Sequence, residues 1–216
     1  LWKYFIILVF SLSFQSQYCK LRLRLNTNKM SGIYIHIPFC KQACHYCDFH
    51  FSTNLKKKDE MVLALAKEIE MRKSEFQDEI VETIYFGGGT PSILQIADLK
   101  FLIDAVYKNY KVVENPEITV EANPDDLTEN RIIELSNNKV NRLSIGIQSF
   151  FEDDLQLMNR AHNVEEAKKC LEIATQYFDN ISIDLIYGVP EMSNEKWLQN
   201  IETALSFGVP HISSYA

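Results

Sequence analysis

The sequence predicts an α/β fold in which parallel strands alternate with helices, arranged as a barrel or as part of one. Two observations support this prediction. Six short β-rich runs are separated by segments with helical spacing, which is typical of βα units. Apolar and polar residues also alternate within the strands, whereas ordinary parallel strands form continuous apolar runs. With 216 residues, 46% of them apolar and 24% charged, the chain has the composition of one soluble domain.

The six predicted strands follow one another at regular intervals. They are residues 32–38, 83–89, 117–124, 142–149, 180–188 and 211–216. Between them, apolar residues recur at the i, i+3, i+4, i+7 spacing of a buried helix face. The three clearest sets are Val62, Leu65, Ala66 and Ile69; Leu99, Leu102, Ile103 and Val106; and Ala167, Cys170, Leu171 and Ala174. Asn163 with Glu166, and Thr128, are predicted to cap the starts of two helices.

The alternation within the strands predicts a polar barrel interior. In the strand 142–149, Ile145 and Ile147 share one face, and Ser144 and Gln148 share the other. Ordinary barrels fill the interior with branched apolar side chains. Because buried polar groups are costly unless they are hydrogen-bonded, we expect this interior to hold a polar ligand. The ligand is expected near the carboxyl ends of the strands, where the βα loops meet.

Residues 1–29 are expected to lie outside the domain. Their apolar run, residues 4–14, is too short to span a bilayer, so no stable membrane span is predicted. Lys3 before the run resembles a secretory signal, but the chain opens with Leu1 and lacks a convincing cleavage site. We interpret Met30 as the true start, residues 1–29 as an upstream extension, and residues 30–216 as the domain. The net charge of −7 argues against a nucleic-acid partner.

Three of the five cysteines stand within eight residues, in the run CKQACHYC after the first predicted strand. This grouping indicates a metal site in a reducing compartment such as the cytoplasm. Four thiolates close an iron–sulfur cluster, whereas Cys40, Cys44 and Cys47 would leave one iron open to a ligand. Zinc is the alternative, with a histidine as fourth ligand. The candidate histidines are His36, His45 and His50.

Five motifs together resemble the radical S-adenosylmethionine superfamily. They are YIHIPFCKQACHYC, YFGGGTPS, VEANPDD, SIGIQSF and IDLIYGVP. More narrowly, they resemble the oxygen-independent coproporphyrinogen III oxidase-like family, closest to its HemW branch of haem chaperones. The resemblance extends from Tyr34 to Ala216 and implies a partial (β/α)6 TIM-like barrel. The C-terminal domain, in which that branch carries its haem-binding motif, is expected to be absent from this fragment.

The resemblance implies a 4Fe–4S cluster on Cys40, Cys44 and Cys47, with S-adenosylmethionine on the open iron. The family positions that bind S-adenosylmethionine map to Tyr34, Tyr46, Gly88, Gly89, Thr90, Glu121, Gln148, Arg160 and Asp184. The glycines are expected to let the backbone approach the methionine end of this cofactor. The residues alone leave open a surface ion-pair role for Arg160. Cys170 is expected in the core, and His50 and His162 on the surface. The pattern assigns no catalytic residue.

Two functions remain open. The oxidase branch has a further cysteine two residues after the third ligand, where this sequence has Phe49. Phe49 therefore favours a haem chaperone, which binds haem and delivers it to haem proteins. The alternative is a coproporphyrinogen III oxidase, which oxidatively decarboxylates propionates through a 5′-deoxyadenosyl radical. A third reading is a cluster protein without radical chemistry. The expected partners are S-adenosylmethionine, haem or a porphyrinogen, and haem-accepting proteins; the sequence predicts no oligomeric state.

Overall fold

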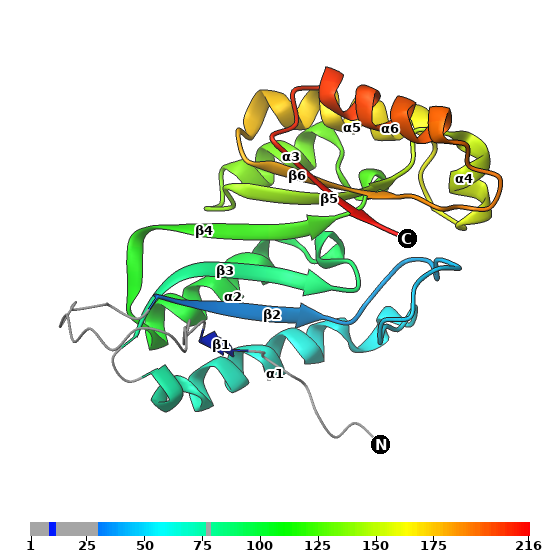
Figure 1. Cartoon of the computed structure of the whole chain (residues 1–216). Coiled ribbons are helices and arrows are strands. Elements are labelled where there is room, and N and C mark those ends of the chain that lie inside the picture. The colour runs from blue at the N-terminus through cyan, green and yellow to red at the C-terminus, as the bar shows by residue number, and fades with distance from the viewer. Residues whose placement is uncertain (1–8, 12–29, 77–78) are drawn as a thin grey trace, which may run out of the picture.

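The computed structural model describes residues 9–11, 30–76 and 79–216 as one sheet flanked by helices (Figure 1). The strands are β1 (Val9–Ser11), β2 (Met30–Ile37), β3 (Ile80–Gly88), β4 (Val112–Ala122), β5 (Arg142–Gln148), β6 (Ile181–Ile186) and β7 (His211–Tyr215). The helices are α1 (Lys58–Met71), α2 (Ile96–Asn109), α3 (Glu129–Ser136), α4 (Glu152–Leu157), α5 (Val164–Tyr177) and α6 (Asn194–Ser206).

The sheet order follows the sequence from β1 to β7, and every pair from β2 to β7 is parallel. This order confirms the predicted α/β class and all six predicted strands, as part of a TIM-like barrel. In Figure 1 the loop after β2, helix α4 and the C-terminus lie on the side toward which the strands point. The carboxyl ends of the strands therefore meet the loops that carry the predicted ligands, as in other barrels of this class.

The apolar core lies between the sheet and the helices. On β2, Ile33, Ile35 and Ile37 are each no more than 2% exposed. The predicted helical stripes also face this core, because Leu102 and Val106 of α2 are fully buried against the sheet residues. Cys170 on α5 is 2% exposed, which confirms its expected core position. Burial of this apolar surface is the main force that fixes the helices on the sheet.

The helix starts follow the capping chemistry of the sequence. Asn163 accepts a hydrogen bond from the Glu166 backbone, and the Glu166 carboxylate accepts one from the Asn163 backbone, which completes a capping box on α5. The Thr128 side chain caps α3 by accepting from the Arg131 backbone. Both predicted caps are confirmed.

The N-terminal segment is described only at Val9–Ser11. These residues form β1, which pairs antiparallel with β2 at the edge of the sheet. This pairing differs from the expectation that residues 1–29 take no part in the fold. The other residues of that segment, Cys19 among them, lie outside the described residues. No helix in the described part of the chain combines the length and apolar character that a membrane crossing requires.

Candidate functional site

A cavity of about 610 Å³ opens at the carboxyl ends of the strands. All of the predicted site residues except Tyr34 line it: Cys40, Cys44, Cys47, Tyr46, Gly88, Gly89, Thr90, Glu121, Gln148, Arg160 and Asp184. They come from the loop after β2, from strands β3, β4, β5 and β6 or the residues directly after them, and from the segment between α4 and α5, which carries Arg160. The fold thus brings together residues up to 144 positions apart in the sequence, as from Cys40 to Asp184. The tertiary arrangement therefore agrees with one shared site.

The three cysteines lie on a loop that is closed at its base. The Cys40 amide donates to the Ser52 carbonyl at 3.1 Å, and the Ser52 amide donates to the Pro38 carbonyl at 2.9 Å. All three thiols are free and half-buried. Within the described residues, no three His, Cys, Asp or Glu side chains converge as ligands of a single metal ion. The loop thus presents all three thiols at the cavity.

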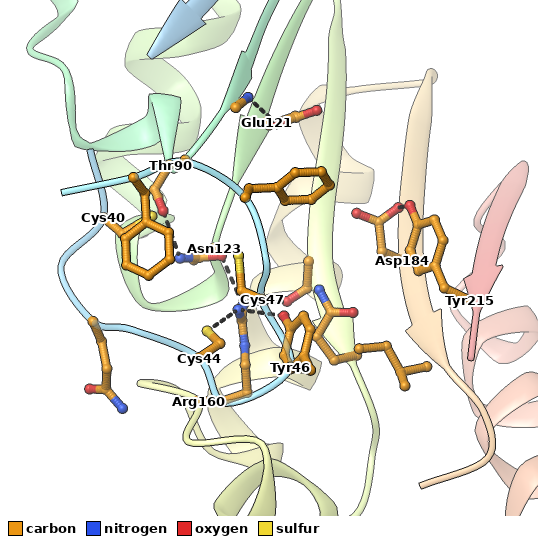
Figure 2. Close-up of a pocket in the computed structure, with 18 of the residues that line it drawn as sticks. Cys40, Cys44, Tyr46, Cys47, Thr90, Glu121, Asn123, Arg160, Asp184 and Tyr215 are labelled. Carbon is orange, nitrogen blue, oxygen red and sulfur yellow. Dashed lines mark hydrogen bonds between the residues drawn. The ribbon is translucent and has the colours of Figure 1, made fainter. Parts of the chain in front are cut away.

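Arg160 reaches into the cavity and joins the cysteine loop to the strand ends (Figure 2). Its Nη1 donates to Cys44 Sγ at 3.2 Å and to Tyr46 Oη at 3.1 Å. Its Nη2 donates to Asn123 Oδ1 and to the Gly146 carbonyl, both at 2.8 Å. The alternative that Arg160 is a surface ion-pair partner is wrong, because its partners are a thiol, a phenol, an amide and a carbonyl within the site.

Two carboxylates lie deeper in the cavity. Glu121 Oε1 accepts from Tyr85 Oη at 2.8 Å, and Oε2 accepts from the Gly88 amide at 2.9 Å. Asp184 Oδ1 accepts from Tyr215 Oη at 3.0 Å (Figure 2). Burial raises the pKa of both carboxyl groups above their usual values, although these hydrogen bonds act in the opposite direction. The cavity can therefore hold a cationic or hydroxyl-rich ligand against them.

The glycine run ending β3 is already required by the protein's own packing. A Cβ at Gly89 would lie 2.6 Å from the Phe39 carbonyl oxygen, because the Gly89 and Thr90 amides donate to the backbone where β2 ends. Gly88 has φ +113°, a conformation that side chains rarely adopt. We expected these glycines to make room for a ligand; the structure shows that packing between β2 and β3 also demands them.

Tyr34 and Gln148 were both predicted to bind S-adenosylmethionine, but only Gln148 lines the cavity. The Tyr34 ring stacks on Tyr85, its hydroxyl lies 3.1 Å from His36 Nδ1, and it does not line the cavity. Gln148 ends β5 with φ +68°, and its buried Oε1 has no hydrogen-bond partner. A left-handed backbone and an unpartnered amide oxygen at a cavity wall are typical of a ligand-binding position.

The structure buries His162, which the sequence predicted on the surface. We expected it on the surface, but it is 3% exposed and its Nε2 lies 3.1 Å from the Ile147 carbonyl. Burial, and then the charge of Arg160, lower its pKa to about 4. His50 is exposed, as expected. The sequence analysis also missed Asn123 and Tyr215, which line the cavity; Asn123 follows Glu121 by two positions, so the strand alternation could have placed it on the same face.

Comparison with known proteins identifies the family. The model of the Radical SAM superfamily matches residues 34–204, which includes the whole cavity except its last strand. The chain belongs to the radical SAM superfamily. Members of this superfamily carry a 4Fe–4S cluster and S-adenosylmethionine, which agrees with the cofactors that the family resemblance implied.

Several named proteins resemble the chain over most of its length. The haem chaperone HemW of Escherichia coli K12 is 37% identical over 188 residues, covering 85% of this chain and 50% of its own length. HemW of Bacillus subtilis 168 is 38% identical over 190 residues, covering 87% and 50%. Among solved structures, the E. coli coproporphyrinogen III oxidase HemN matches with a TM-score of 0.77 and 29% identity, covering 87% of this chain and 44% of HemN. The chain therefore spans about half the length of these relatives.

The residues of the radical SAM cavity fit both cofactors. Three free thiols on one loop can hold a cluster and leave an iron open. S-adenosylmethionine carries a sulfonium and an ammonium group, a carboxylate and ribose hydroxyls. The cavity offers complementary carboxylates in Glu121 and Asp184, a guanidinium in Arg160, and the unpartnered amide oxygen of Gln148. The charges and hydrogen-bonding groups of the site therefore match those of the ligand.

Proposed function

We propose that the protein containing this chain is a haem chaperone, which binds haem and delivers it to haem proteins. In this proposal residues 30–216 supply the core that holds the cluster and S-adenosylmethionine. The observation that carries the proposal is Phe49, which lines the cavity and is 75% exposed. It stands where the oxidase branch has a further cysteine. The curated HemW relatives, at 37% and 38% identity, support the same assignment.

The cavity mouth is suited to a flat apolar ligand. Phe49, Phe51 and Tyr215 line it, and the exposed faces of Phe49 and Tyr215 are in contact with solvent. Aromatic side chains that are exposed beside a cavity offer faces on which a planar ligand can stack. A porphyrin offers a planar apolar face of the kind that such side chains can cover.

We assign the residues of the cavity to separate tasks. Cys40, Cys44 and Cys47 hold the cluster. When bound and reduced, the cluster supplies an electron for cleavage of the sulfonium of S-adenosylmethionine. Arg160 fixes the loop beside Cys44 by the 3.2 Å contact and leaves Tyr46 positioned against the adenine.

The remaining ligands hold S-adenosylmethionine against the open iron. Glu121 and Asp184 accept hydrogen bonds from its hydroxyl or ammonium groups, since both carboxylates lie in the cavity. Gln148 offers the Oε1 that has no partner within the protein. The backbone at Gly88 and Gly89 and the Thr90 hydroxyl complete the set. Tyr34 supports it indirectly, because its ring stacks on Tyr85, which donates to Glu121.

The second candidate is a coproporphyrinogen III oxidase. It is favoured by the structural match to HemN, at a TM-score of 0.77. In that case the same cluster and cofactor would support oxidative decarboxylation of propionates. Phe49 argues against it, because a phenyl ring cannot supply the thiol that the oxidase branch has there.

Haem titration and turnover assays on the natural protein distinguish the two candidates. The chaperone proposal predicts a Soret band that saturates at a fixed haem ratio, and no vinyl product from coproporphyrinogen III under anaerobic reduction. Vinyl product formed over many turnovers would overturn the proposal and establish the oxidase. A cluster protein without radical chemistry would form no 5′-deoxyadenosine on reduction with dithionite. The four cysteines among the described residues are free, which supports a reducing compartment, and we propose the cytoplasm.

A further inference from the structure

One short segment, Leu157–His162 between α4 and α5, contacts both the cysteine loop and the end of β5. The two partners lie more than 100 residues and about 15 residues away in sequence, respectively, as the contacts of Arg160 with Cys44 and Gly146 illustrate. We propose that this segment, here called the 157–162 clamp, holds the cysteine loop in the geometry that receives the cluster. Within it, Asn159 and His162 are positioning residues.

The loop side of the clamp is made by Leu157, Met158 and Asn159, together with the Arg160 contacts to Cys44 and Tyr46 described above. The Leu157 carbonyl lies 3.0 Å from His45 Nδ1. Asn159 Nδ2 donates to the Ala43 carbonyl at 2.8 Å, and the Asn159 carbonyl and Oδ1 accept from Gln42 Nε2 at 2.8 and 3.0 Å. The His45 amide donates to the Met158 carbonyl at 3.1 Å. These contacts hold the loop between Cys40 and Cys47 through residues other than the three cysteines, so they can form before a cluster binds.

Asn159 has a backbone that suits this task. Its φ is +55°, in the left-handed region that asparagine adopts more readily than most residues. The conformation turns the chain at the end of α4, so that the side chain and the carbonyl of one residue both face the cysteine loop. A glycine at this position would keep the backbone and remove only the side-chain bonds.

The sheet side of the clamp is made by Arg160 and His162. Their hydrogen bonds go to successive carbonyls, those of Gly146 and Ile147, directly before Gln148. Because a carbonyl can only accept, His162 Nε2 carries the hydrogen and Nδ1 is bare, buried and unpartnered. At the same place the register between β5 and β6 is interrupted, and Gln148 has positive φ. His162 thus fixes the irregular strand end that orients Gln148.

The physical consequence is pre-organisation. A flexible loop loses conformational entropy when it becomes ordered around the cluster, and this loss weakens binding unless other contacts already order the loop. The clamp orders the loop in advance and ties it to the strand end that carries Gln148. This inference depends on the cluster-binding role of the cysteines and is independent of the haem proposal.

The loop side is tested on the metal-free protein by amide hydrogen exchange. Asn159→Gly is expected to lower the protection of the His45 amide about tenfold, the effect of losing one or two net hydrogen bonds. Lys139→Gly is the matched control, because Lys139 also has positive φ, at 65°, but lies in the turn before β5 at the opposite end of the sheet. Equal protection of His45 in wild type, Asn159→Gly and Lys139→Gly would overturn the proposal.

The same variants, reconstituted with iron and sulfide, test the consequence for the cluster. Asn159→Gly is expected to release iron to a chelator at least several-fold faster than wild type, whereas Lys139→Gly is expected to match wild type. An unchanged release rate in Asn159→Gly would also contradict the clamp. Neither readout involves haem, so a failure here is distinct from failure of the chaperone proposal.

The sheet side is tested by binding of S-adenosylmethionine to the cluster-loaded protein. His162→Leu removes the donor to the Ile147 carbonyl and is expected to weaken binding about tenfold. His162→Gln keeps an amide donor and is expected to recover most of the affinity. Unchanged affinity in His162→Leu, or equal loss in both variants with unchanged iron content, would contradict a positioning role for this residue.

Discussion

The two faces of the parallel sheet are built from neighbouring residues of the same strands, yet their chemistry is opposite. On β5, Ile145 and Ile147 are fully buried against the helices, whereas Ser144 and Gln148 line the cavity. On β4, Ile118 and Val120 lie in the core and Glu121 faces the cavity. The outer face therefore supplies stability through burial, and the inner face supplies binding groups.

The carboxylates on the cavity face are partly buried, which lowers the stability of their ionised forms in the folded protein. Burial raises the pKa of Glu121 and Asp184, so each ionised carboxylate is less stable in the folded protein than in water. The apolar core on the outer face, with its fully buried isoleucines, stabilises the sheet that carries these groups. Paired substitutions, one in the core and one in the cavity, test this interpretation directly.

The largest expected effect compares Cys44, on the cavity loop, with Cys170, on α5 in the core between the sheet and the helices. Cys44→Ala is expected to abolish stable assembly of the cluster, since two thiolates cannot hold it in place of three. Cys170→Ala, in the outer core, is expected to retain the cluster and to lower the free energy of unfolding by about 1–2 kcal/mol. Iron and sulfide per chain and the visible spectrum after anaerobic reconstitution measure the first effect, and urea denaturation the second. A full cluster in Cys44→Ala would contradict the assignment.

The second comparison uses two residues of β4. Ile118→Ala is expected to lower the free energy of unfolding by about 2–5 kcal/mol, because it removes fully buried apolar volume. Glu121→Gln is expected to lower it by less, about 1 kcal/mol, because the single amide oxygen can accept from Tyr85 or from the Gly88 amide but not from both. In cluster-loaded protein Glu121→Gln is expected to weaken S-adenosylmethionine binding about tenfold. Denaturation and calorimetric titration check the two halves, and equal stability losses would break the comparison.

The third prediction concerns the pH dependence of stability and His162, which contacts the Ile147 carbonyl near the end of β5. Its pKa is about 4 in the folded protein and 6.5 in the unfolded chain, so below pH 6.5 the unfolded chain binds a proton that the folded protein does not. The charged groups that act on it are Arg160, Asp125 and Glu152. The free energy of unfolding is therefore expected to fall by about 3 kcal/mol from pH 6.5 to pH 4.

His162→Leu removes this titration, so its stability should depend less steeply on pH over the same window. Thermal denaturation at a series of pH values measures the slope. Identical slopes in wild type and His162→Leu would show that another group carries the dependence.

The smallest effect on stability is expected at the cavity mouth. Phe49→Ala removes a side chain that is 75% exposed, so the free energy of unfolding is expected to change by less than about 0.5 kcal/mol. The iron content is expected to match wild type. Haem affinity of the natural protein is expected to fall, and a haem titration that superimposes on wild type would contradict the proposal that haem packs against Phe49.

Much of this arrangement could be predicted from periodicity and motifs. The strand alternation around Ile145 and Ser144 set the two faces, and the spacing Cys40, Cys44, Cys47 indicated the cofactor loop. What could not be predicted depends on contacts between distant residues. The surroundings of His162 are set by β5 and α4, which bury a residue that sequence alone places in a loop. The hydrogen bonds between Asn159 and Ala43 join residues 116 positions apart.

Two further features show the same limit. β1 depends on pairing with β2, and a three-residue strand has no periodicity to detect. The glycines before Thr90 were explained by a ligand, but the close approach between the ends of β2 and β3 also requires them. In each case the role of the residues depends on a strand that they pair with or pack against in the folded protein.

The central claim is that three cysteines hold a 4Fe–4S cluster with one iron open to S-adenosylmethionine. Electron paramagnetic resonance of the anaerobically reconstituted, reduced chain tests it most directly, with and without S-adenosylmethionine. The account predicts about four irons per chain and a cluster signal whose g-values shift when S-adenosylmethionine is added. One zinc per chain with no iron–sulfur absorption, or a cluster signal that is indifferent to S-adenosylmethionine, would contradict it.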